Sequence, residues 1–213
     1  VVNNYFGLPF NSSNDVAWAD RTDPRSGHRH RAMFFTDNDF GAPSLLNETG
    51  PAVLPNTVWR FNPDTESLQP VISRADIPDP NGVAVNLDAT KLYVSDTPVS
   101  YIRGGGIGPS GSPAIYVYDL TENLVPVNKR LFSFSRSGIP DGIKVDKIGR
   151  VWSAEGEGVV VRDSREKILG VFNDKILLNS PEGQIANFAL YEDRLIMLAE
   201  ECIWSIQLGQ LVW

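Results

Sequence analysis

The feature that most constrains this chain is an internal repeat, in which three short phrases recur four times in the same order. The first phrase opens with a polar residue and runs into an apolar segment, at residues 14–18, 81–85, 141–145 and 187–190. The second phrase follows a polar turn, at residues 33–37, 92–96, 151–155 and 195–199. The third follows a variable loop, at residues 57–61, 115–119, 159–163 and 202–206. Such self-similarity is typical of repeat architectures.

Each phrase is short, rich in β-branched and aromatic residues, and bounded by Gly, Pro, Asn or Asp, which predicts a β-strand. Three repeats offer a fourth strand, at residues 68–73, 130–134 and 168–172. Four consecutive strands in a unit of roughly 40 to 65 residues are the sequence form of a propeller blade. We therefore expect an all-β chain, a β-propeller of about four blades with hardly any helix.

This propeller is expected to be incomplete at its N-terminal side. The fourth repeat leaves only residues 208–213 for an outer strand, and residues 1–5 resemble the outer strand of a blade whose inner strands are absent. Residues 1–213 are thus predicted to be a single propeller domain that lacks its N-terminal blades. An open arc would expose apolar faces and unpaired strand edges. We expect missing blades or a companion chain to cover them.

Charge and composition exclude several classes of partner. The formal net charge of −7 argues against binding to nucleic acid or to anionic membrane surfaces. No apolar run approaches the roughly 20 residues that span a bilayer. Two N-glycosylation sequons begin at Asn11 and Asn47. They favour a secreted or secretory-pathway protein, and a cytoplasmic location is the alternative.

The candidate site consists of the residues that open the four inner strands, which are Asn14, Asn81, Asp141 and Asn187. In a propeller these strands line the central channel, so their opening side chains should converge on its axis. Amide and carboxylate oxygens suit Ca²⁺ or another hard divalent cation. The alternative is that Asn and Asp recur because every blade needs a turn there. The parallel between Pro80-Asn81-Gly82 and Pro140-Asp141-Gly142 favours the site.

These phrases resemble the family of gluconolactonase, regucalcin (senescence marker protein) and the fungal lactonohydrolases, with the fungal branch the most similar. The matching segments run through the whole chain in family order, at residues 11–16, 34–37, 80–84, 92–97, 140–143 and 151–156. The resemblance implies a six-bladed propeller with one divalent metal, often Ca²⁺, at the axis. It implies Asn81 and Asp141 as metal ligands, and Asn14 as a further ligand or a substrate-orienting amide. The family's other ligand, a glutamate in a Glu-Gly-Pro phrase, has no counterpart here.

The expected activity is therefore hydrolysis of a small lactone of the aldonolactone type. The metal would polarise the lactone carbonyl, and Asp141, the only carboxylate among the four openings, would take a proton from the attacking water. Asn14 and Asn187 are expected to contact the substrate. Two alternatives stay open: a phosphotriesterase-like hydrolase at the same site, and a binding module in which the metal is structural.

Other candidates are weaker. His28 and His30 lie in an inserted basic loop, where an incidental role is favoured over metal binding. Asp37 and Asp96 end second strands and are expected to hold turns rather than to do chemistry.

Overall fold

The structure is a computed structural model that describes residues 2–43, 45–98, 111–177, 184–199 and 202–213. Regular structure in these residues is almost entirely β-strand, and the one described helix, α2 (Asp174–Leu177), has four residues. None of the described helical structure is long and apolar enough to cross a membrane. The expected all-β class is confirmed.

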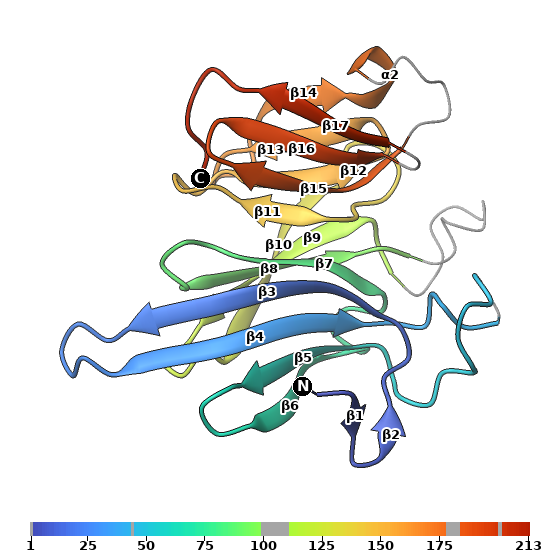
Figure 1. The fold of residues 1–213 in the computed structure, drawn as a ribbon, viewed down its shortest axis with the longest axis vertical. Coiled ribbons are helices and arrows are strands. Elements are labelled where there is room, and N and C mark those ends of the chain that lie inside the picture. Colours follow the sequence, from blue (N-terminus) through green and yellow to red (C-terminus); the bar gives the residue numbers. More distant parts are fainter. Residues whose placement is uncertain (1, 44, 99–110, 178–183, 200–201) are drawn as a thin grey trace.

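The blades are four antiparallel sheets; in Figure 1 the first lies at the bottom, the second lies above it, and the third and fourth overlap at the top. The first blade contains β3 (Ser13–Thr22), β4 (Arg29–Asp37), β5 (Thr57–Asn62) and β6 (Ser67–Ser73). The second contains β7 (Pro80–Val85), β8 (Lys91–Asp96), β9 (Ala114–Leu120) and β10 (Pro126–Phe134). The third contains β11 (Ile143–Val145), β12 (Val151–Glu155), β13 (Gly158–Arg162) and β14 (Ile168–Asn173). The fourth contains β15 (Ile185–Tyr191), β16 (Arg194–Ala199) and β17 (Cys202–Gln207).

Strands pair in sequence order within each blade, and the first strands β3, β7, β11 and β15 contact one another in turn. The expected four-blade propeller arrangement is confirmed, as are the outer strands β6, β10 and β14.

Two details of the sequence prediction are wrong. β1 (Asn4–Tyr5) pairs with β2 (Leu8–Pro9) in a small hairpin and is not the outer strand of a blade. The turn between them is local, with positive φ at Phe6 and Gly7, so these residues need no partner sheet. Residues 208–213 form no strand, so the fourth blade ends at its third strand within the described residues.

Apolar residues that alternate along the strands fill the space between successive blades. Phe34 and Ile72 of the first blade share a buried cluster with Leu92 and Val94 of the second. Further clusters join the second blade to the third and the third to the fourth. Burial of a side chain of this size contributes about 1.5–3 kcal/mol each. The blades are therefore held together chiefly by hydrophobic packing.

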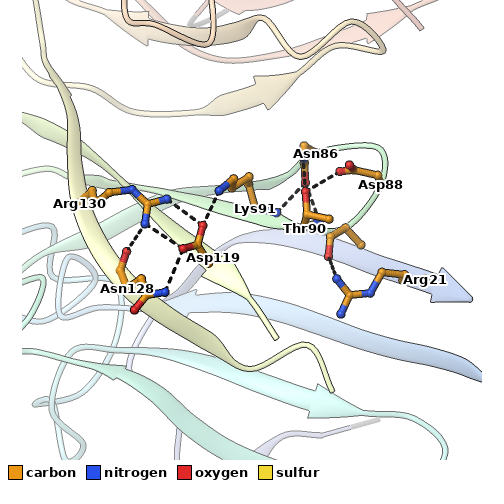
Figure 2. Close-up of polar contacts among 9 residues, drawn as sticks. Arg21, Asn86, Asp88, Thr90, Lys91, Asp119, Asn128 and Arg130 are labelled. Carbon is orange, nitrogen blue, oxygen red and sulfur yellow. Dashed lines mark hydrogen bonds and ion pairs between the residues drawn. The ribbon is translucent and has the colours of Figure 1, made fainter. Parts of the chain in front are cut away.

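Polar contacts add to this packing at the ends of the blades away from the inner-strand openings (Figure 2). Asp119 on β9 accepts hydrogen bonds from Lys91, Asn128 and Arg130, all within the second blade. Arg21 on β3 reaches across from the first blade and donates to the backbone carbonyls of Ala89 and Thr121. These contacts hold the second blade's sheet edge and tie it to β3.

Candidate active site at the inner-strand openings

The openings of the inner strands are fixed by hydrogen bonds that pass from one blade to the next. The Thr36 hydroxyl, on the first blade, donates to the backbone carbonyl of Asn81 at 2.6 Å. The Ser95 hydroxyl, on the second, donates to the carbonyl of Asp141 at 2.9 Å. Thr36 and Ser95 occupy the same position in their blades, one residue before the end of the second strand. Asn81 and Asp141 are therefore structurally equivalent, as the aligned phrases predict.

The glycines after these residues allow the close approach of the strands. A Cβ on Gly82 would overlap the backbone carbonyl oxygen of Asp141. A Cβ on Gly142 would overlap Oδ1 of Asn187. Each opening thus depends on the absence of a side chain at the next position, which explains the Asn-Gly and Asp-Gly pairs.

The fourth blade is offset by one residue from the sequence alignment. The amide of Gly142 donates to the carbonyl of Ala186 at 2.9 Å, so Ala186 takes the place that Asn81 and Asp141 hold in their blades. Asn187 instead corresponds to Asp15. Both side chains accept from the backbone N–H of the following residue, at 2.8 Å for Asn187 and 2.9 Å for Asp15.

Asn81 and Asp141 lie together at the opening of the channel. Asn81 is 3% exposed, and its Oδ1 atom has no hydrogen-bond partner among the described residues. Burial, with a further effect of the Asp15 charge, raises the pKa of Asp141 to about 6. A hydrogen bond with the Asn81 side chain and the positive charge of Lys144 oppose that rise.

Two residues that sequence reasoning missed, Asp15 and Lys144, contribute charge to this site. The Lys144 ammonium lies 3.3 Å from Oδ1 of Asn187 and 3.6 Å from Oδ2 of Asp15. Asp15 Oδ2 also accepts from the amide of Val83, at 3.2 Å. These contacts join all four blades directly beneath the openings.

Lys144 could have been recognised from the aligned repeats. It stands where the first two inner strands carry alanine, at Ala17 and Ala84, and the register in the structure adds Ala189 at the same level. All four residues line an axial cavity of about 340 Å³ with otherwise apolar walls. The three small side chains leave the space into which Lys144 extends.

Asn14 is exposed at the start of β3, and no hydrogen bond to its side chain is present in the described part of the chain. The first-blade residue that acts on Asp141 is Asp15, whose negative charge raises the pKa of Asp141. Asn14 remains at the mouth of the site, free to contact a ligand.

The donor set at Asn81 and Asp141 fits a hard divalent cation. A buried carbonyl oxygen without a hydrogen bond costs about 1–3 kcal/mol, and a cation would satisfy Asn81 Oδ1. The carboxylate beside it supplies negative charge, and both donors are oxygen, as Ca²⁺ prefers. Among the described residues no three His, Cys, Asp or Glu side chains cluster for a metal, so amide oxygens are essential to such a site.

Carboxylates at the ends of the second strands have a structural role, as expected. Asp37 accepts from the backbone amides of Asn11 and Ser12, and Asp96 from that of Asp79. Each thereby holds the segment that leads into its own inner strand.

The two sequons differ in their surroundings. Asn11 is buried, and its Nδ2 atom, which would carry a glycan, donates to the carbonyl of Leu54 at 2.7 Å. Its Oδ1 atom accepts from the amide of Val53. Asn47 is exposed. Of the two, only Asn47 offers an accessible amide in this fold.

Comparison with known proteins agrees with the propeller fold. The family model described as the SMP-30/gluconolactonase/LRE-like region matches residues 28–173. A gluconolactonase of Zymomonas mobilis is 31% identical over 183 residues, which are 81% of this chain and 44% of the relative. Lactonohydrolase oryL of Aspergillus oryzae is 31% identical over 191 residues, 84% of this chain and 41% of the relative.

Solved structures give the same result. A gluconolactonase of Xanthomonas campestris is 32% identical, with a TM-score of 0.73 over 98% of this chain and 61% of that one. A calcium-binding protein, regucalcin, of Agrobacterium tumefaciens is 19% identical with a TM-score of 0.60, which shows a shared fold. The chain spans less than half the length of the curated relatives it matches. It belongs to the SMP-30/gluconolactonase/LRE-like family.

Proposed function

We propose that this chain forms part of a metal-dependent hydrolase that opens a small lactone, of the aldonolactone type, to its hydroxy acid. The observation that carries the proposal is the pairing of Asn81, with its unpartnered buried oxygen, and Asp141 at the channel opening of a gluconolactonase-family propeller. The named activities of the relatives from Zymomonas mobilis and Aspergillus oryzae support the reaction class.

Asn81 and Asp141 would hold the cation, most simply Ca²⁺, and the remaining ligand would come from outside this chain. A bound divalent cation supplies Lewis-acid polarisation of a carbonyl oxygen. Asp141 acts as the general base, because a carboxyl with a pKa of about 6 is mostly ionised at neutral pH and still accepts a proton readily.

In the reaction, the water oxygen bonds to the lactone carbonyl carbon while its proton passes to Asp141. The ring C–O bond then breaks, and the ring oxygen takes that proton to become the hydroxyl of the product. The Lys144 ammonium has three N–H groups; it donates a hydrogen bond to Asn187 and forms an ion pair with Asp15 at 3.6 Å, so an N–H is left for a substrate oxygen. Asn187 thus acts on the substrate through Lys144, because it accepts a hydrogen bond from the Lys144 ammonium and helps to hold that ammonium in place. The exposed amide of Asn14 orients the substrate at the mouth of the channel.

The test is lactone hydrolysis by the full-length protein, measured with added Ca²⁺, with chelator, and for variants. Asp141→Ala should lower kcat/KM by at least about a hundredfold, since general-base catalysis alone contributes about 10²–10⁴-fold. Asn81→Ala should chiefly weaken metal binding. Glu122→Ala, an exposed carboxylate between β9 and β10, is the matched control and should be unchanged.

Turnover by Asp141→Ala at the wild-type rate, or in excess chelator, would contradict the mechanism. A protein that binds Ca²⁺ but opens no lactone would instead favour the binding-module alternative.

We further propose that the remaining blades of the propeller, or a companion chain, cover the open faces of this one domain. Ile203 and Trp204 on the edge strand β17 are 74% and 38% exposed, and Trp18 on β3 is 58% exposed. Apolar exposure at an unpaired strand is a site for association. Light scattering on residues 1–213 alone should show self-association, and a stable monomer would argue against the proposal.

The exposed sequon at Asn47 supports a location in the secretory pathway.

A further inference from the structure

A second polar cavity lies on the first blade, at the start of β4, which is the end of that strand away from the candidate active site. It has a volume of about 600 Å³ and is lined by side chains from β4, β5 and the adjoining turns, among them His28, His30, Arg29, Arg31, Arg60 and Asp64. We call it the Arg60 pocket. All of the side chains that line it are polar or charged, which suits a hydrophilic ligand better than an apolar one.

Arg60 is the reason to expect an anion there. Its side chain belongs to a residue that is 6% exposed, and buried cations are almost always paired with a carboxylate. Its recorded partners are neutral: the carbonyls of Leu124 and Asn123, at 2.9 and 2.6 Å, and the amide oxygen of Gln69 at 3.4 Å. No carboxylate forms an ion pair with it in the described part of the chain, and burial lowers the pKa of its guanidinium.

The rest of the wall adds donors and positive charge. Arg29 is paired with Asp20 and Arg31 with Asp64, so each of these guanidinium groups is neutralised once and keeps further N–H groups. The rings of His28 and His30 meet edge to face, with centroids 4.5 Å apart. Neither imidazole has a hydrogen-bond partner among the described residues, and both border the cavity.

We propose that the Arg60 pocket is a binding site for an oxyanion, a phosphate or sulfate group carried by a small molecule. The anion provides the charge that Arg60 lacks and accepts hydrogen bonds from the guanidinium and imidazole groups around it. Because the chain has a net charge of −7, an anion is attracted to the positive charge of the Arg60 pocket in preference to the rest of the surface.

The experiment is isothermal titration of the full-length protein with inorganic phosphate and with inorganic sulfate, using chloride at matched ionic strength as the reference. Saturable binding at one site is expected for phosphate and sulfate and not for chloride. Arg60→Gln should weaken the affinity about tenfold, the loss of one charge-assisted contact. His30→Ala should weaken it by about threefold. Arg165→Gln removes an arginine whose side chain is 87% exposed in another blade, and it should change nothing.

Absence of saturable binding by the wild-type protein would overturn the proposal. So would equal weakening by Arg60→Gln and Arg165→Gln, because that result indicates attraction to overall charge only. If Arg60→Gln fails to fold, His30→Ala decides: weaker binding supports the pocket, and unchanged binding refutes it. Lactone hydrolysis should be the same in His30→Ala as in wild type, so this test is independent of the proposed function.

Discussion

Replacement of Gly82 by alanine tests whether the site depends on close contact between neighbouring inner strands. The new Cβ would overlap the carbonyl oxygen of Asp141 and lie 3.0 Å from the amide of Ile143, both backbone atoms. Overpacking of this kind costs about 1–3 kcal/mol. Displacing the Asp141 carbonyl from the Ser95 hydroxyl adds about 0.5–1.5 kcal/mol. Alanine recovers about 0.4–1 kcal/mol through the unfolded chain. The net expectation is a destabilisation of about 2 kcal/mol.

Gly142→Ala is the matched comparison, because its Cβ would overlap the side chain of Asn187, whereas the backbone carbonyl oxygen of Ala186 lies farther away, at 3.1 Å. A side chain can rotate away, so we expect a loss of about 1 kcal/mol, and the double variant with Asn187→Ala should recover most of it. Urea denaturation of the full-length protein measures both, and Gly82→Ala should lower the midpoint by about 1 M for a slope of about 2 kcal/mol/M. Stability of Gly82→Ala within 0.5 kcal/mol of wild type (about one RT) would refute the reasoning.

Three further predictions concern charge and modification. Burial raises the pKa of Asp96 to about 6, above the value of 3.8 expected when exposed, so its contribution to stability is present at low pH and is lost as the pH rises from about 4 through 6. Asp96→Asn should remove a slope worth about 3 kcal/mol in unfolding measured across that range. Asp119→Asn removes the ion pairs of Asp119 with Lys91 and Arg130, and it should lower the free energy of unfolding by less than about 1 kcal/mol. Added salt should reduce this loss. Expression through a eukaryotic secretory pathway should place a glycan on Asn47 and not on Asn11, as peptide mass spectrometry would show.

Strand positions and the pairing of Asn81 with Asp141 could be predicted because they depend on local patterns. Apolar and polar residues alternate along each strand, and the residue after each of these two openings is glycine. Both signals are visible within a few residues of chain, and each repeat reinforces the others. The same reasoning failed where a pattern had two physical explanations, as at residues 1–5, where a strand-like run folds back on itself.

The register of the fourth blade could not be predicted in this way. Phe188 pairs with Met197 as Val83 pairs with Val94, so Asn187 takes the position of Gly82, one step later than an alignment by residue type places it. The hydrogen bond from Gly142 to Ala186, a contact between blades, shows the same offset. Contacts between blades depend on packing over long sequence separations, about which a local phrase carries no information.

The position of Lys144 shows what the repeat pattern does reveal when it is broken. Two carboxylates, Asp15 and Asp141, act on each other in a partly buried site, and their mutual repulsion disfavours the charged form of Asp141. Lys144 opposes this effect, and its ammonium also contacts Asp15 directly. The other three strands carry alanine at this level, which packs well and needs no partner. A lysine there adds charge in an otherwise apolar cavity, at a cost that hydrophobic packing does not offset. The departure from alanine is therefore explained by the two acidic groups above it, and not by the stability of the channel wall.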